Sequence, residues 1–175
     1  MAPLFRRLTH APEPGPEAFF WHHRDLPGLA WLDGGPRAPS MFTWRPGPSV
    51  PGGPGWPERL RGLLRPGPRF EEAPFAGGVV GFVGYEAGRH VERMPEPAGL
   101  GLLPDLVLRR HEGALWFHPR KGRWVAAGTP EFVEEAEERL RAVSGPPPAP
   151  GMGSGTLVDA DRPLAFQHAV RRVQD

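Results

Sequence analysis

A glycine-rich stretch in the middle of the chain has the residue types of a phosphate-binding loop. Gly78, Gly81 and Gly84 form the pattern G-x-x-G-x-x-G. The dinucleotide-binding pattern is instead G-x-G-x-x-G with an acidic residue about 20 positions farther on, and a P-loop ends in Lys followed by Ser or Thr. Because neither pattern is present, we interpret residues 75–85, FAGGVVGFVGY, as a buried strand. Its glycines have no side chain and so let another backbone or a bulky group approach closely.

Histidine, cysteine and serine offer no recognisable catalytic or metal-binding pattern. The chain has seven histidines and no cysteine, and no two histidines stand four positions apart around a glutamate, as a helical zinc site needs. Without cysteine there is no thiolate nucleophile and no disulfide. No serine lies in the G-x-S-x-G motif of a nucleophile elbow. The sequence therefore predicts no metal site and no catalytic residue in this chain.

The remaining candidates for chemistry are carboxylates and tryptophans. The adjacent pairs Glu71–Glu72 and Glu134–Glu135 could do acid–base chemistry only if folding placed one carboxyl group in a cleft with a raised pKa. We interpret these pairs as solvated faces of a loop and a helix. Trp31 and Trp44 lie on two predicted strands and could line a pocket, but aromatic side chains dominate protein cores, so core packing is favoured.

Charge and composition argue against several classes of function. The chain has 21 lysines and arginines against 20 aspartates and glutamates, which gives a net charge of +1. It lacks the clustered basic residues that nucleic-acid binding requires. It also lacks a run of 18 apolar residues and a signal-peptide pattern. We therefore expect a cytoplasmic protein that binds neither nucleic acid nor a membrane.

The elements that must position these residues are predicted from hydrophobic periodicity and from the placement of Gly and Pro. Strands are expected at residues 3–9, 29–33, 40–46, 105–111, 114–119 and 123–128. Helices are expected at residues 15–25, 56–65 and 129–143. The second and third strands form a predicted hairpin, and the last three form a predicted meander. Together these elements indicate an α+β fold of antiparallel sheets with flanking helices.

A change in composition divides the chain near its C-terminal end. Residues 1–144 are expected to form one domain, and residues 145–160, rich in Pro and Gly, a linker. Residues 161–175 carry three apolar residues at helical spacing, Phe166, Val170 and Val173. Because this apolar face has nothing of its own to pack on, we expect it to be the truncated start of a further, catalytic domain.

Four segments resemble one known family in their order and spacing. The most specific is PFAGGVVGFVGYEAGRHVE (74–92), which is similar to the motif P-F-x-G-G-x-x-G-(Y/F)-x-x-Y-(D/E). The others are AWLDGGPRAPSMFTWRP (30–46), LLPDLVLRRHEGALWFHPRKGRW (102–124) and LAFQHAVRRVQD (164–175). Together they resemble component I of two chorismate-utilising enzymes, anthranilate synthase and aminodeoxychorismate (para-aminobenzoate) synthase.

This resemblance implies that the chain is the N-terminal part of an anthranilate synthase component I-like fold. The family aminates chorismate with ammonia from a glutamine amidotransferase subunit. Its chorismate pocket and its Mg²⁺, which polarises the substrate, lie in a catalytic domain that would follow this chain. The resemblance thus implies that the chain itself holds no catalytic residue and no Mg²⁺, and that it supports the catalytic domain and offers surface to the amidotransferase.

The resemblance also implies a candidate effector site. In the family, a turn of the N-terminal part helps to bind tryptophan, and the matching residues here are Leu32, Asp33, Gly34 and Ser40. Gly34 replaces the family's serine, and the arginine expected before Ser40 is absent, so we expect no tight tryptophan pocket. The L-D-G-G form favours the aminodeoxychorismate branch, which leads to para-aminobenzoate and folate. Two alternatives stay open: anthranilate synthase component I, and a non-catalytic module that binds an aromatic ligand.

Overall fold

The computed structural model describes residues 3–8, 14–93 and 104–147. Their strands are β1 (Leu4–Leu8), β2 (Ala30–Leu32), β3 (Ser40–Thr43), β4 (Gly78–Val83), β5 (Leu106–His111), β6 (Gly113–His118) and β7 (Arg123–Gly128). The α-helices are α1 (Pro16–His23), α2 (Trp56–Leu63) and α3 (Pro130–Ala142), and the 3₁₀ helices are η1 (Gly35–Arg37) and η2 (Tyr85–His90). The predicted α+β fold with antiparallel sheets is confirmed. None of the described residues forms a helix long and apolar enough to cross a membrane.

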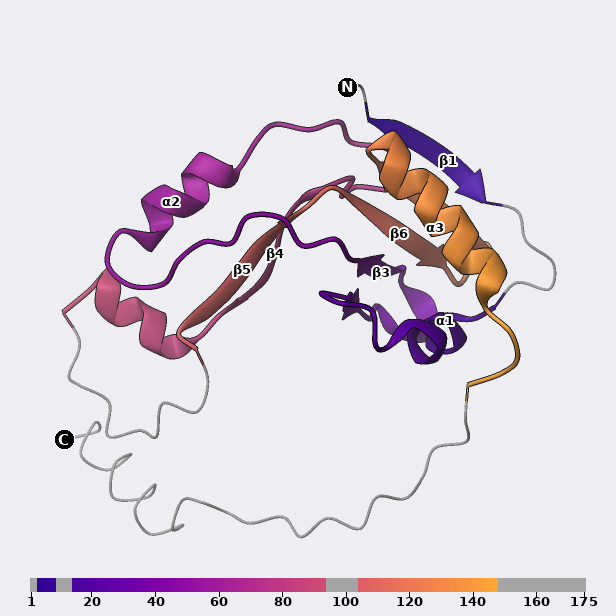
Figure 1. Ribbon diagram of the computed structural model, residues 1–175, viewed down its shortest axis with the longest axis horizontal. Helices are drawn as coiled ribbons and strands as arrows, with labels where there is room; N and C mark the ends of the chain where they lie inside the picture. The colour runs from indigo at the N-terminus through magenta and orange to yellow at the C-terminus, as the bar shows by residue number, and fades with distance from the viewer. Residues whose placement is uncertain (1–2, 9–13, 94–103, 148–175) are drawn as a thin grey trace, which may run out of the picture.

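Five strands form the main sheet, in the order β1-β7-β6-β3-β2, with every neighbouring pair antiparallel. Helices α1 and α3 lie over one face of it (Figure 1). The core between sheet and helices is rich in aromatic rings, chiefly Phe19, Phe42, Trp44, Trp124 and Phe132. The predicted hairpin of β2 and β3 is confirmed, since Trp31 pairs with Phe42.

Helix α3 forms where the sequence predicts it. Thr129 is its N-cap, and the Thr129 hydroxyl accepts a hydrogen bond from the Phe132 N–H at 3.3 Å. Pro130 follows in the first turn, where its missing N–H costs nothing. The helix then buries one stripe of side chains against the sheet: Phe132, Val133, Ala136 and Leu140.

The opposite face of the main sheet is covered by the segment around residues 70–76. Ala73 is buried there with Val125 and Ala127, and Phe70 packs against Phe5 with ring centroids 5.0 Å apart. The segment is held to the sheet because the Trp116 Nε1 donates to the carbonyl of Phe75 at 2.9 Å. The sheet therefore has a filled layer on each side.

The two strands β4 and β5 form a separate antiparallel ribbon. The predicted meander is therefore wrong in part. Strands β6 and β7 form a hairpin, but β5 belongs to the other sheet, and a single residue, Glu112, separates it from β6. One residue is too short a connection for a turn between paired neighbours. In Figure 1, the ribbon and α2 lie on the left and the main sheet on the right.

The prediction that residues 75–85 form a buried strand is also wrong in part. Gly78–Val83 is a strand, but Phe82 and Val83 are both 46% exposed. The predicted close approach is present: a Cβ on Gly81 would lie 1.8 Å from the carbonyl oxygen of Val107 on β5. Glycine at this position thus serves backbone packing, because any side chain would collide with the neighbouring strand.

The expected domain division stays a prediction. The described residues up to 147 include the whole of both sheets, whereas residues 148–160 of the expected linker lie outside the described residues. The same holds for residues 161–175 with Phe166, Val170 and Val173, which the sequence assigns to a further domain.

Candidate effector site

The turn between β2 and β3 brings three of the sequence-predicted site residues into direct contact. The Ser40 hydroxyl donates to the Asp33 Oδ1 at 2.8 Å and accepts a hydrogen bond from the Gly34 N–H at 3.2 Å. The Gly35 N–H also donates to the Asp33 Oδ1, at 2.9 Å. Short side chains that bond to nearby backbone groups are typical of such turns. The Ser40 hydroxyl is therefore already used both as a hydrogen-bond donor and as an acceptor.

These bonds set the charge state of the turn. The Gly35 N–H and, next, the Ser40 hydroxyl hold the pKa of Asp33 below its usual value, because both favour the charged carboxylate. Asp33 is exposed, whereas Ser40 is buried. The turn consequently presents a fixed negative charge to solvent, supported from below by a buried hydroxyl.

Gly34 has no room for a side chain. A Cβ at this position would lie 2.2 Å from the carbonyl oxygen of Pro39 and 2.8 Å from that of Ala38. The two ends of the turn thus approach each other at Gly34. A serine here, as in the family that the sequence resembles, would require the turn to take another shape.

A cavity of about 320 Å³ lies beside this turn, within the usual range for a small-molecule site. Asp33 and Ser40 line it from the turn, and Phe117 and Pro119 line it from the end of β6. The remaining wall includes Gly15, Pro16 and Glu17, at the start of α1. Two carboxylates beside an aromatic ring and prolines suit a ligand that carries a cationic group on an apolar body.

The structure does not bring all four predicted residues into the cavity wall. Leu32 is 50% exposed on β2, where it pairs with Met41, and neither Leu32 nor Gly34 lines the cavity. Sequence reasoning missed Glu17 and Phe117. They come from elements far from the turn in the chain, and nothing in their local sequence marks them as partners of Asp33.

A second polar cluster, centred on Glu72, corrects another prediction. Glu72 is 4% exposed, so the interpretation of Glu71–Glu72 as a wholly solvated pair is wrong for this residue. Its carboxylate accepts hydrogen bonds from Arg7 at 2.9 Å, from Lys121 at 2.5 Å and from Arg123. Three cations around one buried carboxylate tie the segment of residues 70–76 to β1 and to the β6–β7 turn.

The tryptophans and the buried histidines have structural roles. Trp44 is fully buried and stacks on Phe132 at 4.5 Å, and Trp31 stacks on Phe42 at 5.4 Å, so the core interpretation is confirmed. His23 and His111 are buried, and each bonds through a ring nitrogen to a backbone carbonyl, of Arg139 and of Trp44 respectively. Burial is the main reason that the pKa of both histidines is lowered.

The described residues do not fit a Mg²⁺ site. Within residues 3–8, 14–93 and 104–147, no group of three or more His, Asp or Glu side chains converges as a metal ion requires. The cavity beside the turn is lined by two carboxylates, Asp33 and Glu17, which is fewer than such a group contains. No step of chemistry is therefore assigned to a metal ion in this part of the chain.

Comparison with known proteins gives a partial match to an enzyme component. No protein-family model matches the chain. The chain is 38% identical over 113 residues to anthranilate synthase component 1 of Thermus thermophilus. The match covers 58% of this chain and 24% of that protein, so the chain spans about a quarter of the length of the curated relative that it matches. This similarity supports the resemblance to chorismate-utilising enzymes that the sequence motifs indicate.

Proposed function

We propose that this chain is the N-terminal region of component I of a synthase that aminates chorismate. The observation that carries this proposal is the 38% identity over 113 residues to anthranilate synthase component 1. Within the described residues, the candidate site has the composition of a ligand-binding turn, and its one hydroxyl bonded to a carboxylate, that of Ser40, is buried and closes the turn. This agrees with a supporting and regulatory part of an enzyme whose chemistry takes place elsewhere.

Two products are supported by different observations. The similarity to anthranilate synthase component 1 favours anthranilate, the product on the route to tryptophan. The turn favours aminodeoxychorismate, on the route to para-aminobenzoate and folate, because Gly34 stands where the family's serine is expected. The shape of the turn also supports this second product, since Gly34 cannot be exchanged for the family's serine without a backbone shift.

The proposal includes two partners. Ammonia would come from a glutamine amidotransferase subunit, and Mg²⁺ would bind in the catalytic part of the complete enzyme, since the described residues hold no site for it.

The cavity beside Asp33 would take a small effector with a cationic group. A non-catalytic module that binds an aromatic ligand is the alternative, and the cavity wall formed by Phe117 and Pro119 is the observation that favours it.

The complete gene product provides the test. We expect it to consume chorismate when ammonium and Mg²⁺ are supplied, and to use glutamine only when an amidotransferase subunit is added. Anthranilate is detected by its fluorescence, and aminodeoxychorismate by its conversion to para-aminobenzoate with an added lyase. The chain of 175 residues alone is the control and is expected to be inactive.

Two results would contradict the proposal. The first is a folded complete gene product that leaves chorismate unchanged under all of these conditions. The second is a reading frame that ends at Asp175 together with tight binding of an aromatic ligand by the chain, which would favour the non-catalytic module.

A further inference from the structure

The outer edge of β4 carries backbone groups that point away from β5. The Gly84 N–H donates to the carbonyl of Asp105 at 2.7 Å, which fixes the phase of the ladder. In an antiparallel pair, residues alternate between bonding to the partner and pointing away from it. From this register, Val80 and Phe82 bond toward β5. The residues whose N–H and C=O groups point outward are Val79, Gly81 and Val83.

The two edges of the ribbon differ. On the β5 side, the Val50 N–H donates to the carbonyl of Leu108 at 2.9 Å, and the Arg110 N–H donates to that of Pro48 at 3.0 Å. The segment of residues 47–50 therefore covers that edge. On the β4 side, no backbone hydrogen bond within the described part of the chain joins the outward groups to another segment.

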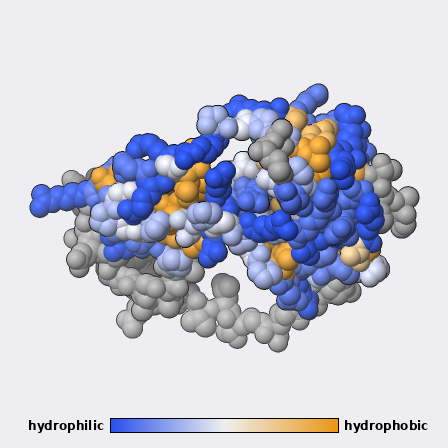
Figure 2. Space-filling model, turned by 45° about the horizontal axis from the view of Figure 1, so that its top comes forward, coloured by the Kyte–Doolittle hydropathy of each residue, from blue (hydrophilic) through white to orange (hydrophobic). Residues whose placement is uncertain are grey.

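The two faces of the ribbon differ as well. On one face, Val79 packs with Leu106 and Leu108 against α2. On the other face, Phe82 is paired with Val107, and Val80, two positions before Phe82 on the same side, is paired with the exposed Arg109. Phe82 is 46% exposed, and Val80 and Val107 are half-buried. Figure 2 shows hydrophobic residues reaching the surface in the left part of the molecule, which holds α2, β4 and β5.

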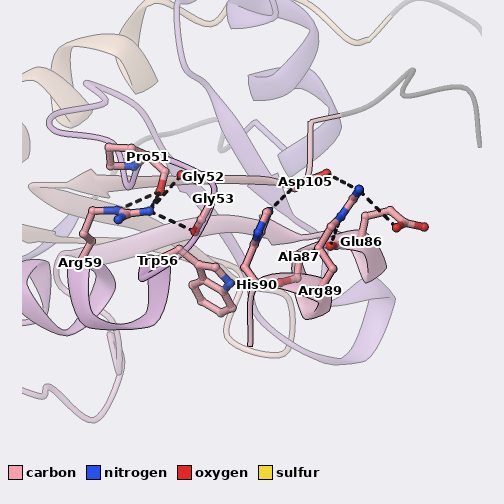
Figure 3. Close-up of polar contacts among 10 residues, drawn as sticks. All are labelled: Pro51, Gly52, Gly53, Trp56, Arg59, Glu86, Ala87, Arg89, His90 and Asp105. Carbon is pink, nitrogen blue, oxygen red and sulfur yellow. Dashed lines mark hydrogen bonds and ion pairs between the residues drawn. The ribbon is translucent and has the colours of Figure 1, made fainter. Parts of the chain in front are cut away.

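Polar contacts hold together the segments on the α2 side of the ribbon (Figure 3). The Trp56 Nε1 donates to the carbonyl of Ala87 at 3.3 Å, which joins α2 to η2. His90 and Arg89 both contact the carboxylate of Asp105, at 3.0 Å and 3.3 Å. The Arg59 guanidinium closes the preceding loop by donating to the carbonyls of Pro51, Gly52, Gly53 and Pro54. The α2 side therefore has its own partners within the domain.

An open, apolar edge of this kind is unfavourable in isolation. A two-stranded ribbon needs a further strand or a packed face for stability, and α2 packs against only one of its two faces. Exposed edges are normally protected by a charge, a proline or a bulge. The residues of β4, GVVGFV, include neither a charged residue nor a proline. Such an edge is suited to the addition of a strand, with main-chain bonds for affinity and apolar side chains packed on the open face.

We propose that the outer edge of β4 and the face formed by Val80, Phe82 and Val107 receive a strand from the catalytic part of the same enzyme. This inference rests on the proposed function. The matched segment is 24% of the relative's length, so an enzyme of that size has most of its chain left to contact this domain. The β4 strand carries no charged side chain, and the face beside it is apolar at Val80, Phe82 and Val107, with one exposed charge at Arg109. A largely apolar surface of this kind fits a permanent contact better than a transient one, because permanent interfaces are the more hydrophobic.

Amide hydrogen exchange tests the proposal by comparing the 175-residue chain with the complete gene product. We expect the Val79, Gly81 and Val83 amides to exchange about 100-fold more slowly in the complete product, because strand addition gives these N–H groups acceptors. The amides of Val80 and Phe82 already donate toward β5, so they serve as the internal control and are protected in both. Equal exchange of the three outward amides in the two proteins would overturn the inference.

A pair of proline variants sharpens the test. Val83→Pro removes an outward N–H, so the 175-residue chain should keep its melting temperature, whereas protection of the Gly81 amide in the complete product should fall more than tenfold. Val80→Pro removes an N–H that faces β5 and should disrupt the ribbon in both proteins. If Val83→Pro unfolds the 175-residue chain as well, the exchange comparison of the unsubstituted proteins still decides.

The outcomes separate this inference from the proposed function. Chorismate turnover with unchanged exchange at the edge would contradict the inference alone. Slow exchange without turnover would contradict the proposed function and leave the docking edge in place. Protection that appears in the 175-residue chain alone and rises with its concentration would identify a second copy as the occupant, and so overturn the catalytic part as the partner.

Discussion

The hydroxyl of Ser40 and the carboxylate of Asp33 are joined by a hydrogen bond of 2.8 Å in which Ser40 is buried and Asp33 exposed. The bond crosses from the first residue of β3 to the residue after β2, so it closes the turn of the hairpin. It also orients the one carboxylate that the turn presents to the neighbouring cavity.

Replacing Ser40 by Ala should raise the pKa of Asp33. The Gly35 N–H would remain as the first cause of the lowered pKa, but the second, the Ser40 hydroxyl, would be lost. A titration of the Asp33 carboxyl carbon by NMR measures the change. Ser40→Thr, which keeps a hydroxyl, is the matched control. An unchanged Asp33 pKa in Ser40→Ala would show that the bond is not formed in solution.

Tryptophan should bind this chain no more tightly than millimolar. The family's serine is replaced by Gly34, and the Ser40 hydroxyl that remains is bonded to Asp33 and to the Gly34 N–H. A new ligand would have to displace bonds that are already made. Isothermal titration calorimetry on the purified chain gives the constant, and a micromolar value would refute this interpretation of the turn.

Replacing Gly34 by Ser or Ala should destabilise the domain by about 2 kcal/mol or more, because a Cβ there would meet the backbone oxygens of Pro39 and Ala38. Chemical denaturation measures the difference. Gly52→Ala is the matched control, since a Cβ at Gly52 has no atom within 4 Å, and it should change stability by less than about 0.5 kcal/mol. If the two variants are equally stable, the turn is less tightly closed than the structure shows.

Glu72→Gln should lower the free energy of unfolding by about 2–4 kcal/mol, because it leaves Arg7, Lys121 and Arg123 around a neutral group. This range is below that for a fully buried network, because the three cations are between 34% and 63% exposed and are partly screened by solvent. The exposed neighbour gives the control, and Glu71→Gln should change stability by less than about 0.5 kcal/mol. A small effect of Glu72→Gln, equal to that of Glu71→Gln, would contradict a role for the cluster in stability.

The domain should lose stability as the pH falls below 6.5, the ordinary pKa of histidine. Burial lowers the pKa of His111 in the folded state, so between that lowered value and pH 6.5 the unfolded chain binds more protons. Above pH 6.5 both states are neutral at this residue and the effect is absent. His111→Gln should therefore flatten the dependence of unfolding free energy on pH between 7.5 and 5.5. An unchanged slope would contradict the buried, neutral state of His111.

Local patterns in the sequence predict the elements well, but not how distant residues meet. Thr129 and Pro130 mark the start of α3 because capping is a property of neighbouring residues. The partners of Glu72 are different: Arg7 is 65 positions away, and Lys121 is 49. No local signal distinguishes Glu72 from the exposed Glu71, because burial depends on what the fold brings over the side chain.

The separation of β5 from β6 was unpredictable for a related reason. The sequence offers two strand-like runs with Glu112-Gly113 between them, which resembles a short turn. The structure instead continues the chain from one sheet to the other, and glycines at the crossing permit the contact: a Cβ on Gly128 would lie 2.4 Å from the Cα of Gly113. Only the pairing of distant strands distinguishes these two outcomes.

The single residue between β5 and β6 connects the ribbon directly to the main sheet. Strand β6 ends beside the turn, where Phe117 pairs with Ser40 and lines the cavity. The same backbone, followed in the other direction through Glu112, becomes strand β5 of the ribbon. Because only Glu112 separates the two strands, the backbone of β6 sets the direction in which β5 leaves the main sheet, and no loop lies between the ribbon and the strand that lines the cavity.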